Sequence, residues 1–427
     1  MAKNKNEPPA MTSDPKLLLH RLFDCAVAAV AAETTVPPAL PPPPKGRTVV
    51  IGAGKAAAAM ARAVEEAWTG DLTGLVVTRY GHRLPTERIE VLEAGHPYPD
   101  SAGEDAARRM LEMARGLTAD DLLLCLISGG GSSLLALPAP GLTLADKQAV
   151  GKALLRCGAT IGEINTVRKH LSAIKGGRLA AAAFPAPCVT LAVSDVPGDD
   201  PSVIASGPTV PDASTFADAR AVLAKYGINP PPAVAAHLER AAEETPKPGD
   251  QHLARAETRI VARPADALAA AAELVHRAGL TPLVLGHDLE GEARELGAAH
   301  AALARKAAPG TVILSGGETT VTVRGNGRGG RNVEYLAGLC LALDGAPGIW
   351  GLAADTDGID GTEDNAGALF DPDSLSRARA AGLDPAAMLA DNDAYSLFKA
   401  LGDLVVTGPT RTNVNDFRAI LVMPAGH

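Results

Sequence analysis

The chain has 427 residues, of which 46% are hydrophobic, 21% are charged and only 3% are aromatic, and its formal net charge is -9. The length exceeds what one ordinary hydrophobic core organises, so two domains are expected. The negative charge and the scarcity of aromatic side chains argue against binding to nucleic acid or to an anionic membrane surface. Any anion site must therefore be a local cluster of cations.

The cysteines and the N-terminus bear on the cellular compartment. The five cysteines show no spacing typical of a zinc site or a redox pair, so reduced, mostly buried thiols are expected. The N-terminal residues lack the apolar segment of a signal peptide, and the apolar run CAVAAVAA is too short to cross a membrane. The sequence predicts a cytoplasmic protein without a membrane segment.

The first half of the chain alternates apolar strands with helices. Residues 1–12 are expected to be a disordered tail, and Ser13 or Asp14 can cap a helix with Pro15 in its first turn. The stretches TVVIGAG, DLLLCLISGGGSS and CVTLAVSDVPGDD are each expected to form a strand that ends in a loop, and residues 143–183 read as helical with a break near Gly162. Uninterrupted apolar strands indicate a mainly parallel sheet covered on both faces.

The second half begins after a proline-rich and charge-rich zone, residues 229–251. We predict a linker at 246–257, which separates one α/β domain, residues 13–245, from a second, residues 258–427. A cleft is expected between the two domains. Within the second domain, an apolar strand at 312–314 is followed by a strand-like run at 319–323.

The stretch 310–334 is rich in glycine and arginine. The apolar strand ends at Gly316 and Gly317, and Gly329, Gly330 and Arg331 precede a helix that opens at Asn332. Glycines allow close approach of a ligand, a helix N-terminus offers free N–H groups, and arginine is a charged donor. The pattern favours an anion cradle over a hairpin tip with solvated arginines.

Two glycine-rich loops in the first half also follow apolar strands. Gly52, Gly54 and Lys55 fit the dinucleotide pattern G-x-G-x-x-A, but Arg79 stands near the place of the acidic residue that this pattern requires. A reductase that uses NADP therefore remains an alternative, and Lys55 is either an anion ligand or a solvated lysine. The second loop offers N–H and hydroxyl groups to a carboxylate or phosphate, from Ser128, Gly129, Gly130, Gly131, Ser132 and Ser133.

Cations cluster after Asn165. Arg168, Lys169, Lys175 and Arg178 form the densest basic group in the chain. On one helix, Arg168, Lys175 and Arg178 are expected to share roughly one face. An anion site and a solvated helix face are about equally compatible with this group.

Aspartates gather in two loops that follow apolar strands. Asp195 opens one loop, and Asp357 and Asp360 lie in the other; such carboxylates suit Mg²⁺ or a general base, although the second loop could equally be a turn capped by its own side chains. Asn413 lies in a third polar loop. Several anion cradles beside clustered aspartates favour phosphoryl transfer over hydride transfer.

The motifs together resemble one known family. VVIGAGKAA, GHPYPD, SGGGSS, EINTVRKHLSAIKGG, VSDVPGDD, ASGPTVPD, SGGETTVTV, GRGGRN, AADTDGIDG and TGPTRTNVND occur in order, from about Leu17 to the C-terminus. This set is similar to the glycerate 2-kinase family with a MOFRL C-terminal domain. The resemblance implies a Rossmann-like N-terminal domain, a smaller α/β domain with its core at 310–423, and an active site in the cleft between them.

The resemblance also implies an activity. Members phosphorylate D-glycerate at the C2 hydroxyl with ATP and Mg²⁺, giving 2-phosphoglycerate and ADP. Members are often named hydroxypyruvate reductase, so NAD(P)H-dependent reduction of hydroxypyruvate is the alternative. The expected partners are D-glycerate and a nucleotide, without nucleic acid or membrane, and the chain is compatible with a homodimer.

The family's proposed catalytic lysine, aspartate and arginine fall on Lys55, Asp195 and Arg331. The loop 128–133 and the region of Arg168 and Lys169 are then expected to hold the glycerate carboxylate or the ATP phosphates. Candidate ligands for Mg²⁺ or the nucleotide are Asp195, Glu318, Asp357 and Asp360.

Overall fold

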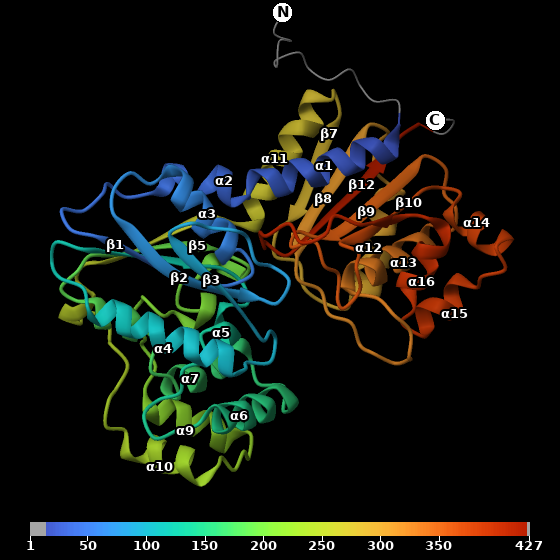
Figure 1. The fold of residues 1–427 in the computed structure, drawn as a ribbon. Helices are drawn as coiled ribbons and strands as arrows, with labels where there is room; N and C mark the ends of the chain where they lie inside the picture. Colours follow the sequence, from blue (N-terminus) through green and yellow to red (C-terminus); the bar gives the residue numbers. More distant parts are fainter. Residues whose placement is uncertain (1–13, 425–427) are drawn as a thin grey trace, which may run out of the picture. The chain divides into compact units, whose positions relative to one another are not determined.

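The computed structural model describes residues 14–424. The chain forms two compact units (Figure 1). Residues 32–262 form the first, called here the Rossmann-like unit, and residues 14–31 and 263–424 belong to the second, called the C-terminal unit. The predicted tail 1–12 lies outside the described residues.

The Rossmann-like unit is built on a six-stranded sheet in which every neighbouring pair of strands is parallel. Its order is β3-β2-β1-β4-β5-β6, the arrangement of dinucleotide-binding folds. The strands are β1 (Thr48–Ala53), β2 (Leu72–Arg79), β3 (Ile89–Ala94), β4 (Leu122–Ile127), β5 (Cys188–Val193) and β6 (Ala256–Ala262). Every residue of β1, β4 and β5 is buried, as their uninterrupted apolar sequences predict.

Helices cover both faces of this sheet. Helix α3 (Ala57–Ala67) lies on one side and α4 (Ser101–Arg115) on the other, where α4 shares a hydrophobic core with α8 (Arg178–Ala183) (Figure 1). Short helices flank them: α2 (Ala32–Thr35), η1 (Pro37–Ala39), α5 (Gly131–Leu134), η2 (Pro197–Asp199), η3 (Ile204–Ser206) and η4 (Gln251–Leu253).

A second hydrophobic cluster of this unit joins four helices beyond the sheet. They are α6 (Leu144–Arg156), α7 (Ile161–His170), α9 (Phe216–Lys225) and α10 (Pro232–Arg240). The break predicted near Gly162 is confirmed at residues 157–160, between α6 and α7; Thr160 caps α7 in a capping box with Glu163, so Gly162 itself lies inside the helix. Because α7 ends at His170, Arg168 and Lys175 do not share a helical face as predicted.

The C-terminal unit contains a mixed six-stranded sheet of order β11-β10-β9-β12-β8-β7, in which only β7 and β8 pair in parallel. Its strands are β7 (Thr281–Gly286), β8 (Thr311–Gly317), β9 (Ile349–Asp355), β10 (Gly367–Phe370), β11 (Leu404–Val405) and β12 (Asp416–Val422). The strand predicted at 319–323 is absent; this segment has only an isolated bridge between Thr320 and Glu292.

Two groups of helices cover the C-terminal sheet (Figure 1). Helix α1 (Pro15–Ala29) packs on α11 (Pro264–Arg277), β9 and β12, and Asp14 caps it through the N–H groups of Lys16 and Leu17. A separate core contains α12 (Ala293–Ala304), α13 (Arg331–Leu343), α14 (Ser374–Ala380), α15 (Pro385–Ala390) and α16 (Ala394–Leu401).

The unit boundaries differ from the predicted domain boundaries in two places. Helix α1 belongs to the C-terminal unit, although it precedes the Rossmann-like unit in the chain. The predicted linker 246–257 overlaps η4 and the start of β6, which pairs with β5 as the edge strand of the parallel sheet. Proline and charge content indicated a linker here, but the polar, half-buried strand at 256–262 pairs with β5 of the preceding domain.

The state of the cysteines and the character of the helices are visible in the described residues. All five cysteines are free thiols; Cys125, Cys188 and Cys340 are buried, while Cys25 is half-buried and Cys157 exposed. None of the helices within 14–424 has the length and apolar character needed to cross a membrane.

Candidate active site

The Rossmann-like sheet reverses its strand order between β1 and β4, where folds of this class bind ligands at the carboxyl ends of the strands. Lys55 follows β1 directly, and the loop 128–133 follows β4. Gly52 and Gly54, predicted as ligand-binding, are needed for packing here. A Cβ at Gly52 would lie 2.3 Å from the carbonyl oxygen of Leu126, and one at Gly54 2.1 Å from Oγ of Ser128.

The N-terminus of α3 is closed by the neighbouring loop. The N–H of Lys55 donates to the carbonyl of Gly129 at 2.9 Å, and the N–H of Ala56 donates to Oγ of Ser128 at 3.0 Å. The N–H of Ala57 donates to the carbonyl of Gly54 at 3.2 Å. Ser128 is fully buried and its Oγ binds the helix end, so it has a structural role, and its role as a ligand group stays a prediction.

The remaining hydroxyl groups of the loop connect it to other segments. Gly130 adopts a left-handed conformation, and Oγ of Ser133 donates to its carbonyl at 3.0 Å. Oγ of Ser132 lies 2.8 Å from Oγ of Ser206, which donates to Oδ1 of the buried Asn165 at 2.9 Å. Ser206 was not among the predicted site residues, although its motif ASGPTVPD was part of the resemblance.

Lys175 contacts the same loop through its ammonium group. It is 1% exposed, and its Nζ donates to the carbonyl of Ser132 at 2.8 Å and to that of Ala205 at 3.5 Å. Burial, and then the charges of Lys147 and Arg168, lower the pKa of Lys175 well below its ordinary value. The structure thus brings Asn165, Lys175 and the loop 128–133 together, with the half-buried Arg168 close enough to affect Lys175.

Lys169, another cation of this group, forms an ion pair inside the protein. Its Nζ lies 3.3 Å from Oδ1 of Asp212, and both side chains are buried. Desolvation raises the pKa of Asp212, but Lys169 and the hydrogen bonds from Ser214 outweigh it, and the pKa is lowered overall. Lys169 therefore has a partner inside the protein, unlike the ligand role predicted for it.

His96 and Asp195 complete this end of the sheet. A Cβ at Gly130 would lie 2.9 Å from Nε2 of His96 and 3.6 Å from Cγ of Lys55, so these three residues are neighbours. His96 was missed as a site residue, although it belongs to the motif GHPYPD. Asp195 follows the buried Ser194 at the carboxyl end of β5, two strands from Lys55 in the sheet.

In the C-terminal unit, Arg331 is surrounded by carboxylates. Its Nε lies 2.7 Å from Oδ1 of Asp416, its Nη1 2.5 Å from Oε1 of Glu318 and its Nη2 2.8 Å from Oδ2 of Asp355. Burial opposes the charged guanidinium, but the three carboxylates outweigh it and raise the pKa of Arg331 well above its ordinary value. Glu318, predicted as a metal ligand, is therefore an ion-pair partner of Arg331.

The N-terminus of α13, predicted as an anion site, is occupied by Asp360. Its Oδ1 accepts from the N–H of Asn332 at 3.0 Å and its Oδ2 from that of Val333 at 2.9 Å. A Cβ at Gly330 would lie 2.2 Å from this carboxylate, so glycine is needed for the approach of Asp360. Desolvation raises the pKa of Asp360 to about 6 against the effect of the two N–H groups.

The glycine-rich loop 324–330 is likewise filled from inside the protein. Oδ1 of Asn392 accepts from the N–H groups of Arg324 and Gly325 at 2.7 and 3.1 Å. Asp391 and Asp393 accept from the N–H groups of Asn326 and Arg328, each at 3.0 Å. The predicted anion cradle is therefore a loop whose backbone donors bind the segment 391–393.

Other predicted residues of this unit serve the fold. Gly316 and Gly317 end β8, and a Cβ at Gly317 would lie 2.2 Å from the backbone nitrogen of Leu289. Gly329 precedes α13, and a Cβ at this position would lie 3.0 Å from Cγ2 of Val333. Asn413 is buried in the loop before β12.

Each of the four predicted metal ligands has its own contacts in the fold, and their role as magnesium ligands stays a prediction. Asp360 caps α13, Glu318 binds Arg331, Oδ1 of Asp357 accepts from the N–H of Ile359 at 2.8 Å, and Asp195 belongs to the other unit. The loop of Asp357 and Asp360 is a turn stabilised by its own side chains. Within residues 14–424, no group of three or more His, Cys, Asp or Glu side chains is placed to hold a metal ion.

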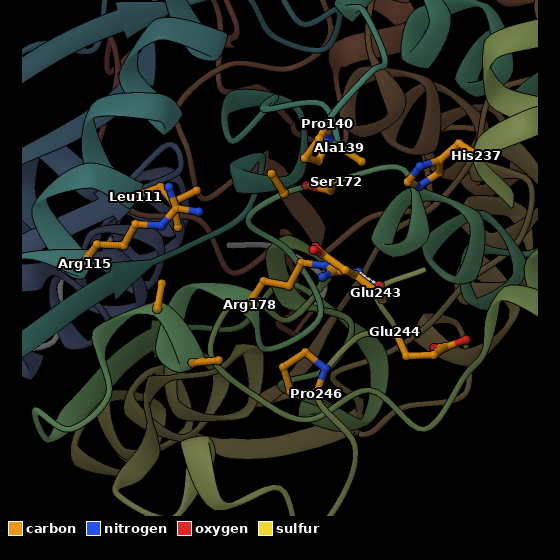
Figure 2. Close-up of a pocket in the computed structure, with 13 residues that line it drawn as sticks. Leu111, Arg115, Ala139, Pro140, Ser172, Arg178, His237, Glu243, Glu244 and Pro246 are labelled. Carbon is orange, nitrogen blue, oxygen red and sulfur yellow. Dashed lines mark hydrogen bonds between the residues drawn. The ribbon is translucent and has the colours of Figure 1, made fainter. Parts of the chain in front are cut away.

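A cavity of ≈ 380 Å³ lies elsewhere in the Rossmann-like unit (Figure 2). Arg115, Ser172, Arg178, His237, Glu243 and Glu244 line it together with apolar residues. Arg178 donates to the carbonyl of Glu243 at 2.6 Å. Arg178 therefore faces this cavity of mixed charge, which includes none of the three predicted catalytic residues.

The fold defines a class: a two-unit α/β protein in which cationic side chains and glycine-rich loops gather at the carboxyl ends of a parallel sheet, where folds of this class bind ligands. Comparison with known proteins then supplies the family. Residues 18–239 match a family described as a domain of unknown function, DUF4147, and residues 311–416 match the MOFRL family.

Similar proteins carry two different names. A putative hydroxypyruvate reductase of Agrobacterium vitis is 58% identical, over 95% of this chain and 94% of its own. A D-glycerate 2-kinase of Thermotoga maritima is 43% identical, over 87% of this chain and 89% of its own. The crystal structure of a Thermotoga maritima glycerate kinase, 40% identical, superposes with a TM-score of 0.87 and covers 96% of this chain and 99% of its own. The chain belongs to the glycerate kinase family with a MOFRL C-terminal domain.

Proposed function

We propose that this protein is a glycerate 2-kinase, which transfers a phosphoryl group from ATP to the C2 hydroxyl of D-glycerate and gives 2-phosphoglycerate and ADP. The observation that carries the proposal is the loop 128–133 together with Lys55, whose N–H donates to Gly129, and the buried Lys175, whose Nζ donates to the carbonyl of Ser132, at the strand ends of a glycerate kinase fold. Both substrates are anions, and buried cations at a glycine-rich loop suit carboxylates and phosphates.

The geometry at α3 argues against the reductase alternative. A dinucleotide fold binds the pyrophosphate with the free N–H groups that open the helix after β1. Here the N–H groups of Lys55, Ala56 and Ala57 already donate to Gly129, Ser128 and Gly54. In addition, β2 ends at Arg79 without the acidic residue that binds the ribose of NAD.

The proposed roles follow from the chemistry of phosphoryl transfer. Asp195 accepts the proton of the C2 hydroxyl while that oxygen forms a bond to the γ-phosphorus and the bond to the ADP oxygen breaks. Lys55 stabilises the charge on the transferred group. Arg331 is proposed to contribute as part of its cluster with Glu318, Asp355 and Asp416, because its guanidinium binds all three.

Magnesium is proposed to bind mainly through the nucleotide. The predicted carboxylate ligands are engaged within the protein, and Mg²⁺ commonly uses one or two carboxylates together with substrate phosphates and water. When bound, the ion would neutralise charge on the β- and γ-phosphates. We further propose that the enzyme is cytoplasmic, because its five cysteines are free thiols, and that it can assemble as a homodimer.

End-product analysis tests the activity. The protein is incubated with D-glycerate, ATP and Mg²⁺, and in parallel with hydroxypyruvate and NADH or NADPH. Formation of 2-phosphoglycerate without oxidation of the reduced nucleotide is expected, and nucleotide oxidation without phosphorylation would reverse the assignment. Lys55→Met should lower kcat by about 10² or more, whereas Lys45→Met, which replaces an exposed lysine of the same unit, should not. Wild-type turnover in Lys55→Met would remove Lys55 from the mechanism.

A further inference from the structure

Lys147 is a further cation beside the loop 128–133, and it was not among the predicted site residues. It lies in α6, half-buried, and its Nζ donates to the carbonyls of Ala136 and Leu137 at 3.2 and 3.1 Å. Lys175 donates to the carbonyl of Ser132 on the same short segment. Two ammonium groups from different parts of the chain therefore meet the segment 132–137.

Within residues 14–424, no carboxylate accepts a hydrogen bond from Lys147, Arg168 or Lys175. Glu104 is the acidic residue that favours the charged form of Lys147, and Glu104 is paired with Arg108 at 2.8 Å. Lys169 shows the contrast, since it has Asp212 as a buried partner. Buried charges of one sign are costly unless an opposite charge accompanies them.

The three cations repel one another. Desolvation, and then the charge of Arg168, lower the pKa of Lys147 to about 7. Lys175 is affected by burial and by both Lys147 and Arg168. The cluster therefore carries less than its full charge near neutral pH, and an anion that enters would favour protonation.

We propose that Lys147, Arg168 and Lys175 form one oxyanion site beside the segment 132–137, to whose carbonyls the ammonium groups of Lys147 and Lys175 donate. This inference rests on the proposed function, because it identifies where an anionic group of the substrate pair binds. The anion is the carboxylate of the hydroxy-acid acceptor or a phosphate of the nucleotide, and both present the same oxygen chemistry.

The pH dependence has a definite sign. Below about pH 7 Lys147 is already charged, so affinity for the anion should depend little on pH. Above that value each binding event must take up a proton, so the Kd should rise by up to about tenfold per pH unit. A purely structural Lys147, which only holds the carbonyls of Ala136 and Leu137, would produce no such coupling.

Calorimetry at pH 8 in buffers of different ionisation enthalpy measures the protons taken up on binding. D-Glycerate, inorganic phosphate and ADP are titrated separately into the whole protein. The ligand whose binding takes up the most protons shows which anionic group, carboxylate or phosphate, binds at the site. Lys147→Met should raise the Kd for that ligand by about tenfold or more and reduce the number of protons taken up by roughly one. Lys152→Met replaces an exposed lysine of the same helix and should change neither quantity.

Lys147→Arg separates charge from proton transfer. Arginine keeps the charge and the donors but does not lose its proton at this pH, so affinity should persist while the uptake falls by roughly one proton. Equal uptake in the wild type and in both Lys147 variants would overturn the inference, as would absence of uptake in the wild type with all three ligands. These two outcomes concern the oxyanion site alone, because product analysis decides the kinase proposal separately. If glycerate is not the substrate, inorganic phosphate still tests the site.

Discussion

At the scale of single residues, Arg331 combines a proposed catalytic role with a structural one. Its guanidinium joins Glu318 after β8, Asp355 at the end of β9 and Asp416 at the start of β12. The carboxylates of Asp355 and Asp416 are buried, and Arg331 is one of the cations that compensate them, since Asp416 also pairs with the buried Arg418. Loss of activity on removing Arg331 would therefore not by itself demonstrate catalysis.

We expect Arg331→Ala to destabilise the C-terminal unit by about 3 kcal/mol, because it removes a cation that pairs with the buried carboxylates of Asp355 and Asp416. Arg331→Lys should recover only part of this loss, since a single ammonium cannot bind three carboxylates in forked geometry. Urea unfolding of the two variants measures the difference. Arg324→Ala, which removes an exposed arginine seven residues earlier, should stay within about 0.5 kcal/mol of the wild type. An unchanged midpoint in Arg331→Ala would contradict the structural role.

At the scale of elements, the loop 324–330 shows how an apparent ligand site can be an internal contact. Its backbone donors bind Asp391, Asn392 and Asp393, and its glycines give these side chains room: a Cβ at Gly325 would lie 2.2 Å from Oδ1 of Asp391. The same chemistry that recognises a phosphate, N–H groups facing an anion, here recognises carboxylates of the protein. The loop is thereby fixed to the start of α16.

Asn392→Ala should release this loop. The side chain accepts two loop N–H groups and donates to the carbonyl of Thr322 and to Glu334, so its removal takes the acceptor from two partly buried donors at a cost of about 1 kcal/mol. Hydrogen exchange should accelerate at residues 324–328 and leave β8 and β12 protected. Asn326→Ala, in which the exposed amide of the same loop is lost, is the matched control and should exchange like the wild type. Equal exchange in both variants would show that Asn392 does not hold the loop.

At the scale of the whole molecule, the order of elements along the chain does not follow the order of the two units. Leu19, Leu22, Phe23 and Ala26 of α1 are fully buried in the C-terminal unit, against α11, β9 and β12. Burying a leucine or phenylalanine side chain contributes about 1.5–3 kcal/mol each. The C-terminal unit therefore needs the first helix of the chain to complete its core, whereas residues 32–262 contain their own.

Fragments test this dependence. A chain of residues 32–262 should unfold cooperatively by itself, because its parallel sheet and two hydrophobic clusters are complete. Residues 263–427 should unfold at a lower temperature than the C-terminal transition of the whole chain, and adding a peptide of residues 13–31 should restore part of the difference. A peptide with Leu22 and Phe23 replaced by Ser is the control. Full stability of 263–427 without the peptide would show that α1 is dispensable.

The sequence by itself determined the chain of apolar strands, the parallel sheet, most helix positions and the family, because these depend on local periodicity and on motifs that are contiguous along the chain. It also located the loop 128–133 and its cations Arg168 and Lys175. Three features were decided only by tertiary structure: the placement of α1, the pairing of β6 with β5, and the partner of each polar group.

The reason is that a residue type specifies what a group can bind but not what lies beside it. Gly330 and Asn332 could have opened toward a phosphate, but Asp360, about thirty residues further along the chain, binds there instead. Lys169 could have bound a ligand, but Asp212 neutralises it. Lys147, which no motif marked, gains its place in the site from carbonyls on another segment. Distances between residues far apart in the sequence decide which charges are compensated and which remain to bind a substrate.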